Sequence, residues 1–239
     1  MIKNNIPNIL TICNLLCGSL AVLVACSNFV PLEYAAYLIF LGAFFDYSDG
    51  FAARILNAYS PMGKELDSLA DLITFGFAPS AIVIAVLQHI IFGNALSDIS
   101  DLHSPYIVFI ILPLMITAFS AIRLAKFNID ESQTSSFSGL ATPASALFFA
   151  GLVFHDTLVF GPWFIIGAVV LMSGLMISNI PMFSLKISSL SFSQYPLQIL
   201  FGVFSIIAFV FLQFQAISLI IGLYILTCII LWLFKPKKQ

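Results

Sequence analysis

The chain has 239 residues, of which 61% are hydrophobic and 8% are charged, and its formal net charge at pH 7 is −2. Soluble domains carry roughly 25% charged residues, so this composition excludes a protein that folds with a water-facing surface. The mean hydropathy of +1.08 indicates an integral membrane protein, and no basic excess points to a nucleic-acid partner.

Apolar runs recur along the whole chain. A helix needs about 20 apolar residues to cross the bilayer core, whereas a β-barrel would show alternating segments of about ten residues. The runs fit the first pattern, so the sequence predicts an all-α integral membrane protein with about eight transmembrane helices. The expected spans are residues 8–27, 32–56, 64–92, 105–127, 142–160, 162–182, 196–214 and 216–234.

The first run opens with MIKNNIPNILTICNLL, which has one lysine ahead of an apolar stretch. No small-residue cleavage site follows, so we interpret the run as a first helix rather than as a signal peptide. The four cysteines form no CxxC pair and lie in or beside apolar runs. That distribution favours packing among apolar side chains over a metal site or a disulfide.

The second and third spans share a stretch that concentrates charge, DYSDGFAARILNAYSPMGKELDSLAD at residues 46–71. Asp67 and Asp71 are four apart and share a face of the third helix, and the segment between the two helices is typical of a turn. A tight turn would bring that face against one stripe of the second helix. At about 100° per residue, this stripe carries Asp46, Asp49, Gly50, Ala53 and Arg54.

These aspartates predict a metal site. An aspartate in a membrane helix costs on the order of 3 kcal/mol, so such a residue indicates function by default. Four neighbouring carboxylates repel one another unless cations lie between them, and hard oxygen ligands suit Mg²⁺, Mn²⁺ or Ca²⁺. Two divalent ions would balance the charge and would suit displacement at phosphorus. Salt bridges from Asp49 to Arg54 or Lys64 are the alternative, but they leave the flanking small residues unexplained.

The spacing also resembles a family signature. The pattern is Asp46-x-x-Asp49-Gly50-x-x-Ala53-Arg54, eight further residues, then Gly63-x-x-x-Asp67-x-x-x-Asp71. It matches the CDP-alcohol phosphotransferase motif at every defining position. The resemblance implies a CDP-alcohol phosphotransferase-like helical bundle. Such an enzyme moves a phosphatidyl or similar group from a CDP-linked donor to an alcohol and releases CMP.

The same resemblance implies a role for each motif residue. Asp46, Asp49 and Asp67 would bind two divalent cations, Mg²⁺ or Mn²⁺. Asp71 would be the general base and could also contact a metal ion. The residues that would border or pair with the CDP moiety are Gly50, Ala53, Arg54 and Gly63.

Three further segments resemble the membrane-embedded phosphatidylserine synthases of this family. They are IPNILTICNLLCG (6–18), RLAKFN (123–128) and FSGLATPASA (137–146). The chain departs from that pattern at Lys126, where arginine is usual, and at Ala141, where proline is usual. The resemblance implies CDP-diacylglycerol as donor and L-serine as acceptor. Asn8 and Thr11 could reach the nucleotide phosphates, or could act as a helix cap and a helix contact.

The fourth span ends with the candidate acceptor-binding residues. Arg123 is our candidate for the serine carboxylate or the donor phosphate, because a guanidinium suits both anions. Lys126 and Lys64 would support it. Arg123 and Lys126 could instead be ordinary positive-inside anchors, and Asn128 could either orient the acceptor or cap the helix end.

All nine basic residues fall on one side of the expected topology, the side that holds both termini and the second, fourth and sixth connections. Lys and Arg favour the cytoplasmic side of a membrane. We therefore expect both termini and the active site in the cytoplasm, with the bacterial inner membrane as host. The basic residues are Lys3, Arg54, Lys64, Arg123, Lys126, Lys186, Lys235, Lys237 and Lys238.

Three parts are expected along the chain. Residues 1–182 would form a six-helix catalytic membrane domain, and the Ser-rich segment 183–195 would be a cytoplasmic interfacial connection. Residues 196–239 would add two transmembrane helices and a basic C-terminal tail. Members of the resembled family often form dimers, which suggests a homodimer.

Other functions stay open at this point. Glycerol phosphate, inositol phosphate or choline could replace serine as acceptor, although a phosphorylated acceptor should require more basic residues than Arg123, Lys126 and Lys64 beside Arg54. A cation transporter would need acids near the membrane midplane, whereas these aspartates lie toward one face. A purely structural membrane protein would leave the acidic cluster unexplained.

Overall fold

The computed structural model describes residues 2–27, 29–92, 107–129, 139–182 and 196–234, and these residues form helices joined by turns, as expected for an all-α protein. The expected connection at 183–195 and the basic tail at 235–239 lie outside the described residues. The helical elements are α1 (Ile2–Ala25), α2 (Glu33–Leu56), α3 (Pro61–Asp71), η1 (Leu72–Phe77), α4 (Ala78–Phe92), α5 (Val108–Ile111), α6 (Leu114–Ile129), α7 (Thr142–Leu152), α8 (Thr157–Ile177), α9 (Pro196–Leu212) and α10 (Gln215–Phe234).

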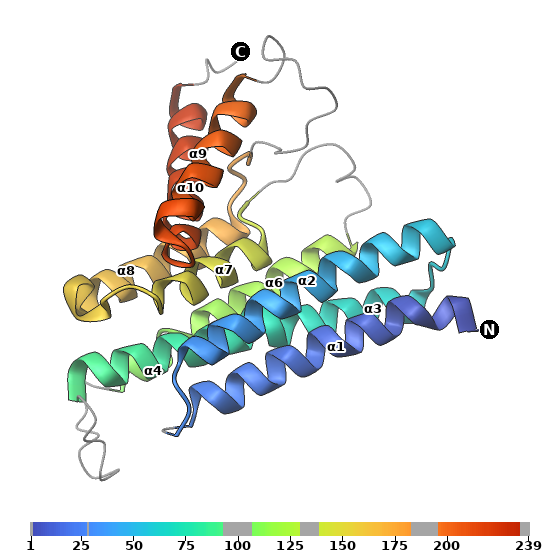
Figure 1. Ribbon diagram of the computed structural model, residues 1–239, viewed down its shortest axis with the longest axis horizontal. Helices are drawn as coiled ribbons and strands as arrows, with labels where there is room; N and C mark the ends of the chain where they lie inside the picture. Colours follow the sequence, from blue (N-terminus) through green and yellow to red (C-terminus); the bar gives the residue numbers. More distant parts are fainter. Residues whose placement is uncertain (1, 28, 93–106, 130–138, 183–195, 235–239) are drawn as a thin grey trace.

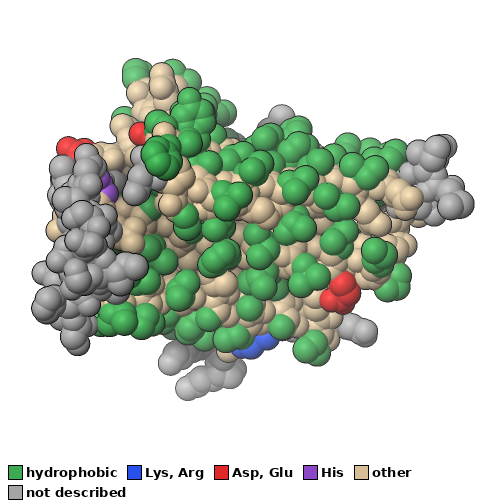
Figure 2. Space-filling model, turned by 90° about the horizontal axis from the view of Figure 1, so that it is seen from below, with side chains coloured by type: hydrophobic (Ala, Val, Ile, Leu, Met, Phe, Trp, Pro, Cys, Tyr) green, Lys and Arg blue, Asp and Glu red, His purple; other side chains and the backbone are tan. Residues whose placement is uncertain are grey.

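The helices have the lengths and surfaces of a membrane protein. Hydrophobic side chains cover most of the face seen in Figure 2, as a lipid-facing surface requires. α2 has 24 residues, but its charged side chains lower its hydropathy, and α7 and α9 are shorter, with 11 and 17 residues. Among the described residues, five segments are long and apolar enough to cross a membrane: Asn5–Ala25, Pro61–Ile91, Val108–Ile129, Phe160–Ile177 and Gln215–Phe234.

The turn between α2 and α3 follows from local backbone chemistry. Asn57 ends α2 in the left-handed conformation with φ of +49°, which asparagine tolerates better than most residues. Ser60 caps α3 by accepting a hydrogen bond from the Gly63 amide at 3.0 Å, and Pro61 occupies the first turn, where no amide donor is needed. The turn reverses the chain, and α2 and α3 both pack against α1.

The third predicted span corresponds to a continuous rod of α3, η1 and α4. η1 is a π-helical turn that begins directly after Asp71. Such wider turns occur frequently at functional sites in helices. The structure also shows why the fifth predicted span is too long: α7 ends at Leu152, and α8 is kinked at Gly161, which has φ of +67° ahead of Pro162.

α1, α2 and η1 meet in a tight junction around Thr74. The Thr74 hydroxyl is buried and donates to the backbone carbonyl of Asn14 at 2.9 Å. A Cβ added at Gly18 would lie 2.6 Å from Thr74 Cα, and one added at Gly42 would lie 2.6 Å from Thr74 Cγ2. Glycine at both positions therefore allows the three backbones to approach this closely.

The last two helices form a hairpin that runs across the direction of the others in Figure 1. Its tip packs by aromatic contact, because Phe214 stacks on Phe40 and Phe154 with ring centroids 5.8 and 5.2 Å apart. The start of α10 fits against α7 at Gly151, where an added Cβ would lie 2.7 Å from the Ser218 amide nitrogen. The hairpin is thus docked on α7 and α2, a packing that hydropathy alone does not predict.

The Thr74 junction yields a stability prediction. Replacing Gly18 with alanine should lower the free energy of unfolding by about 1–3 kcal/mol, because the added methyl group meets Thr74 backbone atoms that cannot move aside. The check is a thermal melt of the purified variant in detergent. Gly167→Ala in α8 is the matched control, because an added Cβ there meets nothing within 4 Å. Equal melting temperatures for the two variants would contradict the close packing.

Candidate active site

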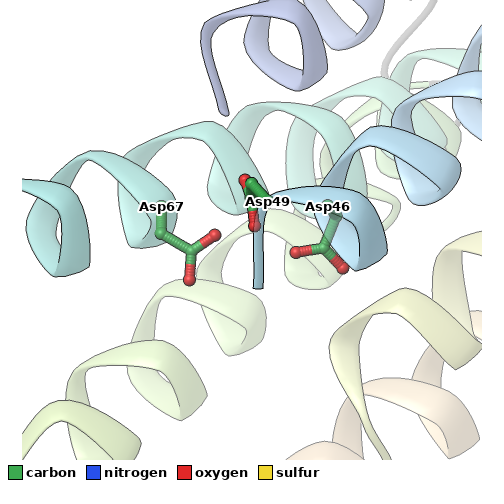
Figure 3. Close-up of side chains that lie close together, drawn as sticks. All are labelled: Asp46, Asp49 and Asp67. Carbon is green, nitrogen blue, oxygen red and sulfur yellow. The ribbon is translucent and has the colours of Figure 1, made fainter. Parts of the chain in front are cut away.

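Three carboxylates from α2 and α3 converge, and both of these helices pack against α1. Asp46, Asp49 and Asp67 each offer an oxygen atom, and these three atoms lie within 4.8 Å of one another. Figure 3 shows Asp46 and Asp49 reaching from α2 toward the same space as Asp67 from α3. Oxygen atoms this close can contact a common divalent cation.

The two basic residues that could pair with Asp49 bond to backbone carbonyls instead. In the described part of the chain, Arg54 Nε donates to its own helix at the Gly50 carbonyl, and Lys64 Nζ donates to the Asn128 carbonyl, each at 3.0 Å. Neither pairs with Asp49, so the salt-bridge alternative is not observed. Asp67 Oδ1 is buried and accepts no hydrogen bond from the described residues. An orphaned carboxylate oxygen beside two other carboxylates fits a cation ligand.

Asp71 lies one turn further along α3 and is 8% exposed. It does not belong to the group of three, although the charges of Asp46, Asp67 and Asp49 all act on it. Its Oδ1 accepts a hydrogen bond from Asn14 Nδ2 at 3.1 Å. Asp71 therefore adjoins the candidate metal cluster and has a neutral donor of its own.

Thr11 contacts a carboxylate directly. Its hydroxyl lies 2.6 Å from Asp49 Oδ2 and 3.0 Å from the Pro7 carbonyl, and the shorter of these bonds joins α1 to α2. A hydroxyl that orients a metal-binding carboxylate commonly tunes the affinity for the metal. The sequence predicted a phosphate contact for Thr11, and the structure adds this bond to Asp49.

A pocket of about 520 Å³ opens beside the carboxylates. It takes in the α2–α3 turn and the start of α1, so it brings together residues that are far apart in sequence. Its lining residues are Pro7, Asn8, Thr11, Asp49, Gly50, Ala53, Ala58, Tyr59, Ser60, Pro61, Gly63, Lys64 and Asp67.

The small residues of the motif shape this pocket. A Cβ added at Gly50 would meet nothing within 4 Å, so the surface of α2 is open there. A Cβ added at Gly63 would lie 3.0 Å from Asn8 Oδ1, which explains why glycine fits at this position. Arg54, predicted to contact phosphate, is exposed and does not line the pocket.

The predicted acceptor-binding residues separate into two groups. Lys64 lines the pocket, and its Nζ donates to the backbone carbonyl of Asn128. The side-chain amide of Asn128 in turn donates to Ser68 Oγ at 2.8 Å. These bonds tie the end of α6 to α3. Arg123 is half-buried and donates through Nη1 to the Met176 carbonyl at 3.0 Å, whereas Lys126 is exposed.

Several site residues were missed from the sequence, and two of them are Asn14 and Tyr59. Asn14 contacts Asp71, and Tyr59 lines the pocket with 72% of its side chain exposed. The position of Asn14, three residues after Thr11 and thus on the same face of an apolar helix, was the signal that could have revealed it. Tyr59 lies in a turn, where helical periodicity gives no signal.

The chain is similar to a known protein family and to known enzymes. Residues 4–180 match the family model described as CDP-alcohol phosphatidyltransferase. A CDP-diacylglycerol–serine O-phosphatidyltransferase of Bacillus subtilis is 39% identical over 149 residues, covering 62% of this chain and 72% of that protein. A protein of the same name from Helicobacter pylori is 32% identical over 240 aligned residues, covering 97% of this chain and 92% of that protein.

The carboxylate cluster and its Thr11 contact predict a measurable metal affinity. Thr11→Val should weaken Mn²⁺ binding about tenfold, because Asp49 loses the donor that fixes its orientation. Titration of Mn²⁺ followed by electron paramagnetic resonance would measure this without any substrate. Thr227→Val is the control, since its hydroxyl bonds only to Leu223 O within α10. Mn²⁺ binding by Thr11→Val at wild-type affinity would contradict the role of this contact.

Proposed function

Because the chain belongs to the CDP-alcohol phosphatidyltransferase family, we propose that it transfers the phosphatidyl group of CDP-diacylglycerol to the hydroxyl of L-serine, giving phosphatidylserine and CMP. Both relatives described above are named for serine as the acceptor. Their similarity supports serine over glycerol phosphate, inositol phosphate or choline. Membership of a transferase family likewise favours this reaction over cation transport.

One observation carries the proposal: the carboxylates of Asp46, Asp49 and Asp67 converge beside a pocket large enough for a nucleotide headgroup. Two divalent cations, Mg²⁺ or Mn²⁺, would bind at these oxygens, and Asp71 lies one turn along α3 from Asp67. Bound there, the ions would stabilise negative charge on the pyrophosphate and on the departing CMP.

The pocket supplies the donor site. The open surface at Gly50 leaves room for a flat or extended group to lie against the α2 backbone, and Gly63 lets Asn8 approach α3. We assign the cytidine and its phosphates to this surface, with Lys64 as a cationic contact, since Lys64 is one of the residues that line the pocket. The acyl chains of the donor can remain in lipid, which the apolar outer faces of the helices contact.

Asp71 acts as general base in this scheme. The serine hydroxyl attacks the β-phosphorus, the one that carries the diacylglycerol, and its O–H bond breaks as the proton passes to an Asp71 carboxylate oxygen. The new O–P bond forms in line with the bond to CMP, which breaks and leaves its electron pair on the CMP oxygen. Asp71 then releases its proton to water. A base of this kind contributes typically 10²- to 10⁴-fold in rate.

Arg123 is our assignment for the serine carboxylate. Its guanidinium is half-buried near the end of α6 and anchored to α8 through the Met176 carbonyl. Residues at the end of α6 bond to α3 through Asn128, which supports an acceptor site next to the metal cluster. Lys126 is exposed, so we assign it to the membrane surface rather than to the substrate.

We also propose that the site faces the cytoplasm and that the host is the bacterial inner membrane. Arg54, Lys64, Arg123 and Lys126 lie at the ends of α2, α3 and α6 that adjoin the aspartates. A concentration of basic residues at one end of a helical bundle is typical of the cytoplasmic side.

The direct test of this function follows CMP release by the purified protein with CDP-diacylglycerol, Mn²⁺ and a panel of alcohols. Serine should support turnover, and glycerol phosphate, inositol phosphate and choline should not. EDTA should stop the reaction, and added Mg²⁺ or Mn²⁺ should restore it, because the carboxylates need cations to bind the diphosphate. Faster turnover with another alcohol would reassign the acceptor, and activity in metal-free buffer would exclude the two-ion scheme.

Removal of the general base gives a second prediction. Asp71→Asn should lower kcat at least about 100-fold, because the amide cannot accept the hydroxyl proton. The variant should remain folded and inserted, which size-exclusion chromatography in detergent would verify. Glu65→Gln is the matched control, since Glu65 is an exposed acid on the same helix. Wild-type CMP release by Asp71→Asn would remove Asp71 as the base.

A further inference from the structure

We propose that Asn14 is a positioning residue that holds the Asp71 carboxylate in the orientation needed to take the acceptor proton; this inference rests on the function proposed above. Asn14 belongs to α1, outside the motif that carries the four aspartates. It reaches Asp71 through a single hydrogen bond, from Nδ2 to Oδ1 at 3.1 Å.

The burial of Asn14 is not explained by packing. Its side chain is 0% exposed, and its Oδ1 accepts no hydrogen bond from the described residues. A buried amide with an unpaired oxygen costs about 1–3 kcal/mol, whereas leucine, of similar size, would fill the same space without that cost. Within the part of the chain that the structure describes, the side-chain amide bonds to Asp71 alone. The amide is therefore retained, at a cost in stability, where it contacts the proposed base.

Contacts with the neighbouring elements η1 and α2 hold Asn14 in place. Its backbone carbonyl accepts the Thr74 hydroxyl at 2.9 Å, which links it to the π-helical turn directly after Asp71. A Cβ added at Gly42 would lie 3.1 Å from Asn14 Oδ1, so α2 closes over the amide. The donor is therefore held by α1, α2 and η1, while the base that it contacts belongs to α3.

An amide suits this position better than a charged donor would. Lysine or arginine would form an ion pair with Asp71 and would repel cations from the neighbouring carboxylates. A neutral N–H donates to Oδ1 of Asp71 and holds the carboxylate without forming an ion pair with it. Without the N–H donor of Asn14, the Asp71 carboxylate would rotate more freely about its terminal side-chain torsion angle. It would then spend less time in the reactive orientation.

The test measures kcat and KM for Asn14→Leu and Asn14→Ala, the second in case leucine does not fit. In both variants kcat should fall about 100-fold, because small misplacements of catalytic groups have effects of that size. The KM for CDP-diacylglycerol should change by less than roughly twofold, since Asn14 does not line the donor pocket. Mn²⁺ binding, followed by electron paramagnetic resonance, should change by less than about threefold in Asn14→Leu.

Ser80→Ala is the matched control, because it removes buried hydrogen bonds to the Gly76 and Pro113 carbonyls and leaves the Asn14–Asp71 bond and the contacts of Asn14 in place. It should lower the melting temperature and keep kcat within about threefold of wild type. All rates are taken per folded protein after size-exclusion chromatography.

The outcomes separate the two proposals. Absence of CMP release from the wild-type protein with every alcohol overturns the proposed function itself. With an active wild type and an inactive Asp71→Asn, either of two results overturns the role of Asn14: kcat within about threefold of wild type in both Asn14 variants, or a loss of kcat equal to that of Ser80→Ala. Loss of Mn²⁺ binding in Asn14→Leu also overturns it, because Asn14 would then act through the metal cluster.

Discussion

The fold of this protein has to hold several carboxylates close together inside an apolar helical bundle, and the rest of the structure depends on this requirement. Oxygens of Asp46, Asp49 and Asp67 lie within 4.8 Å of one another, and like charges at such distances repel strongly where water is scarce. The chain holds them together through its backbone: a capped turn reverses the chain between α2 and α3, and both helices pack against α1. A continuous rod of α3, η1 and α4 carries Asp67 and Asp71 into the bundle. Divalent cations bound between the carboxylates would relieve the repulsion that remains.

α1 contributes neutral hydrogen-bond donors that orient the carboxylates. Thr11 contacts Asp49 and Asn14 contacts Asp71, so one face of α1 orients carboxylates on two other helices. Hydroxyl and amide groups can orient an acid without neutralising it, whereas a basic side chain would compete with the metal. Close packing at Gly18 and Gly42 brings the three helices near enough for these bonds. The glycines thus link the fold of the bundle to the chemistry of the site.

Helical periodicity predicted the features that depend on neighbouring residues. The stripe of α2 and the face of α3 were predicted to meet, and Asp46, Asp49 and Asp67 do converge. The contacts of α1 could not be predicted in the same way, because Thr11 and Asn14 reach partners 38 and 57 residues away. The π-helical turn after Asp71 breaks the assumed period, and the crosswise hairpin of α9 and α10 depends on where Phe214 docks. Arg54 belongs to the motif, yet its guanidinium turns back to its own helix.

The central claim is that these carboxylates bind divalent cations that hold a nucleotide diphosphate. It is tested most directly by determining an experimental structure with Mn²⁺ and CDP and locating the metal by anomalous scattering. The account predicts manganese peaks bounded by the oxygens of Asp46, Asp49 and Asp67, with the CDP phosphates on the side of Gly50. Manganese bound elsewhere, or these three side chains pointing apart around an empty centre, would contradict it.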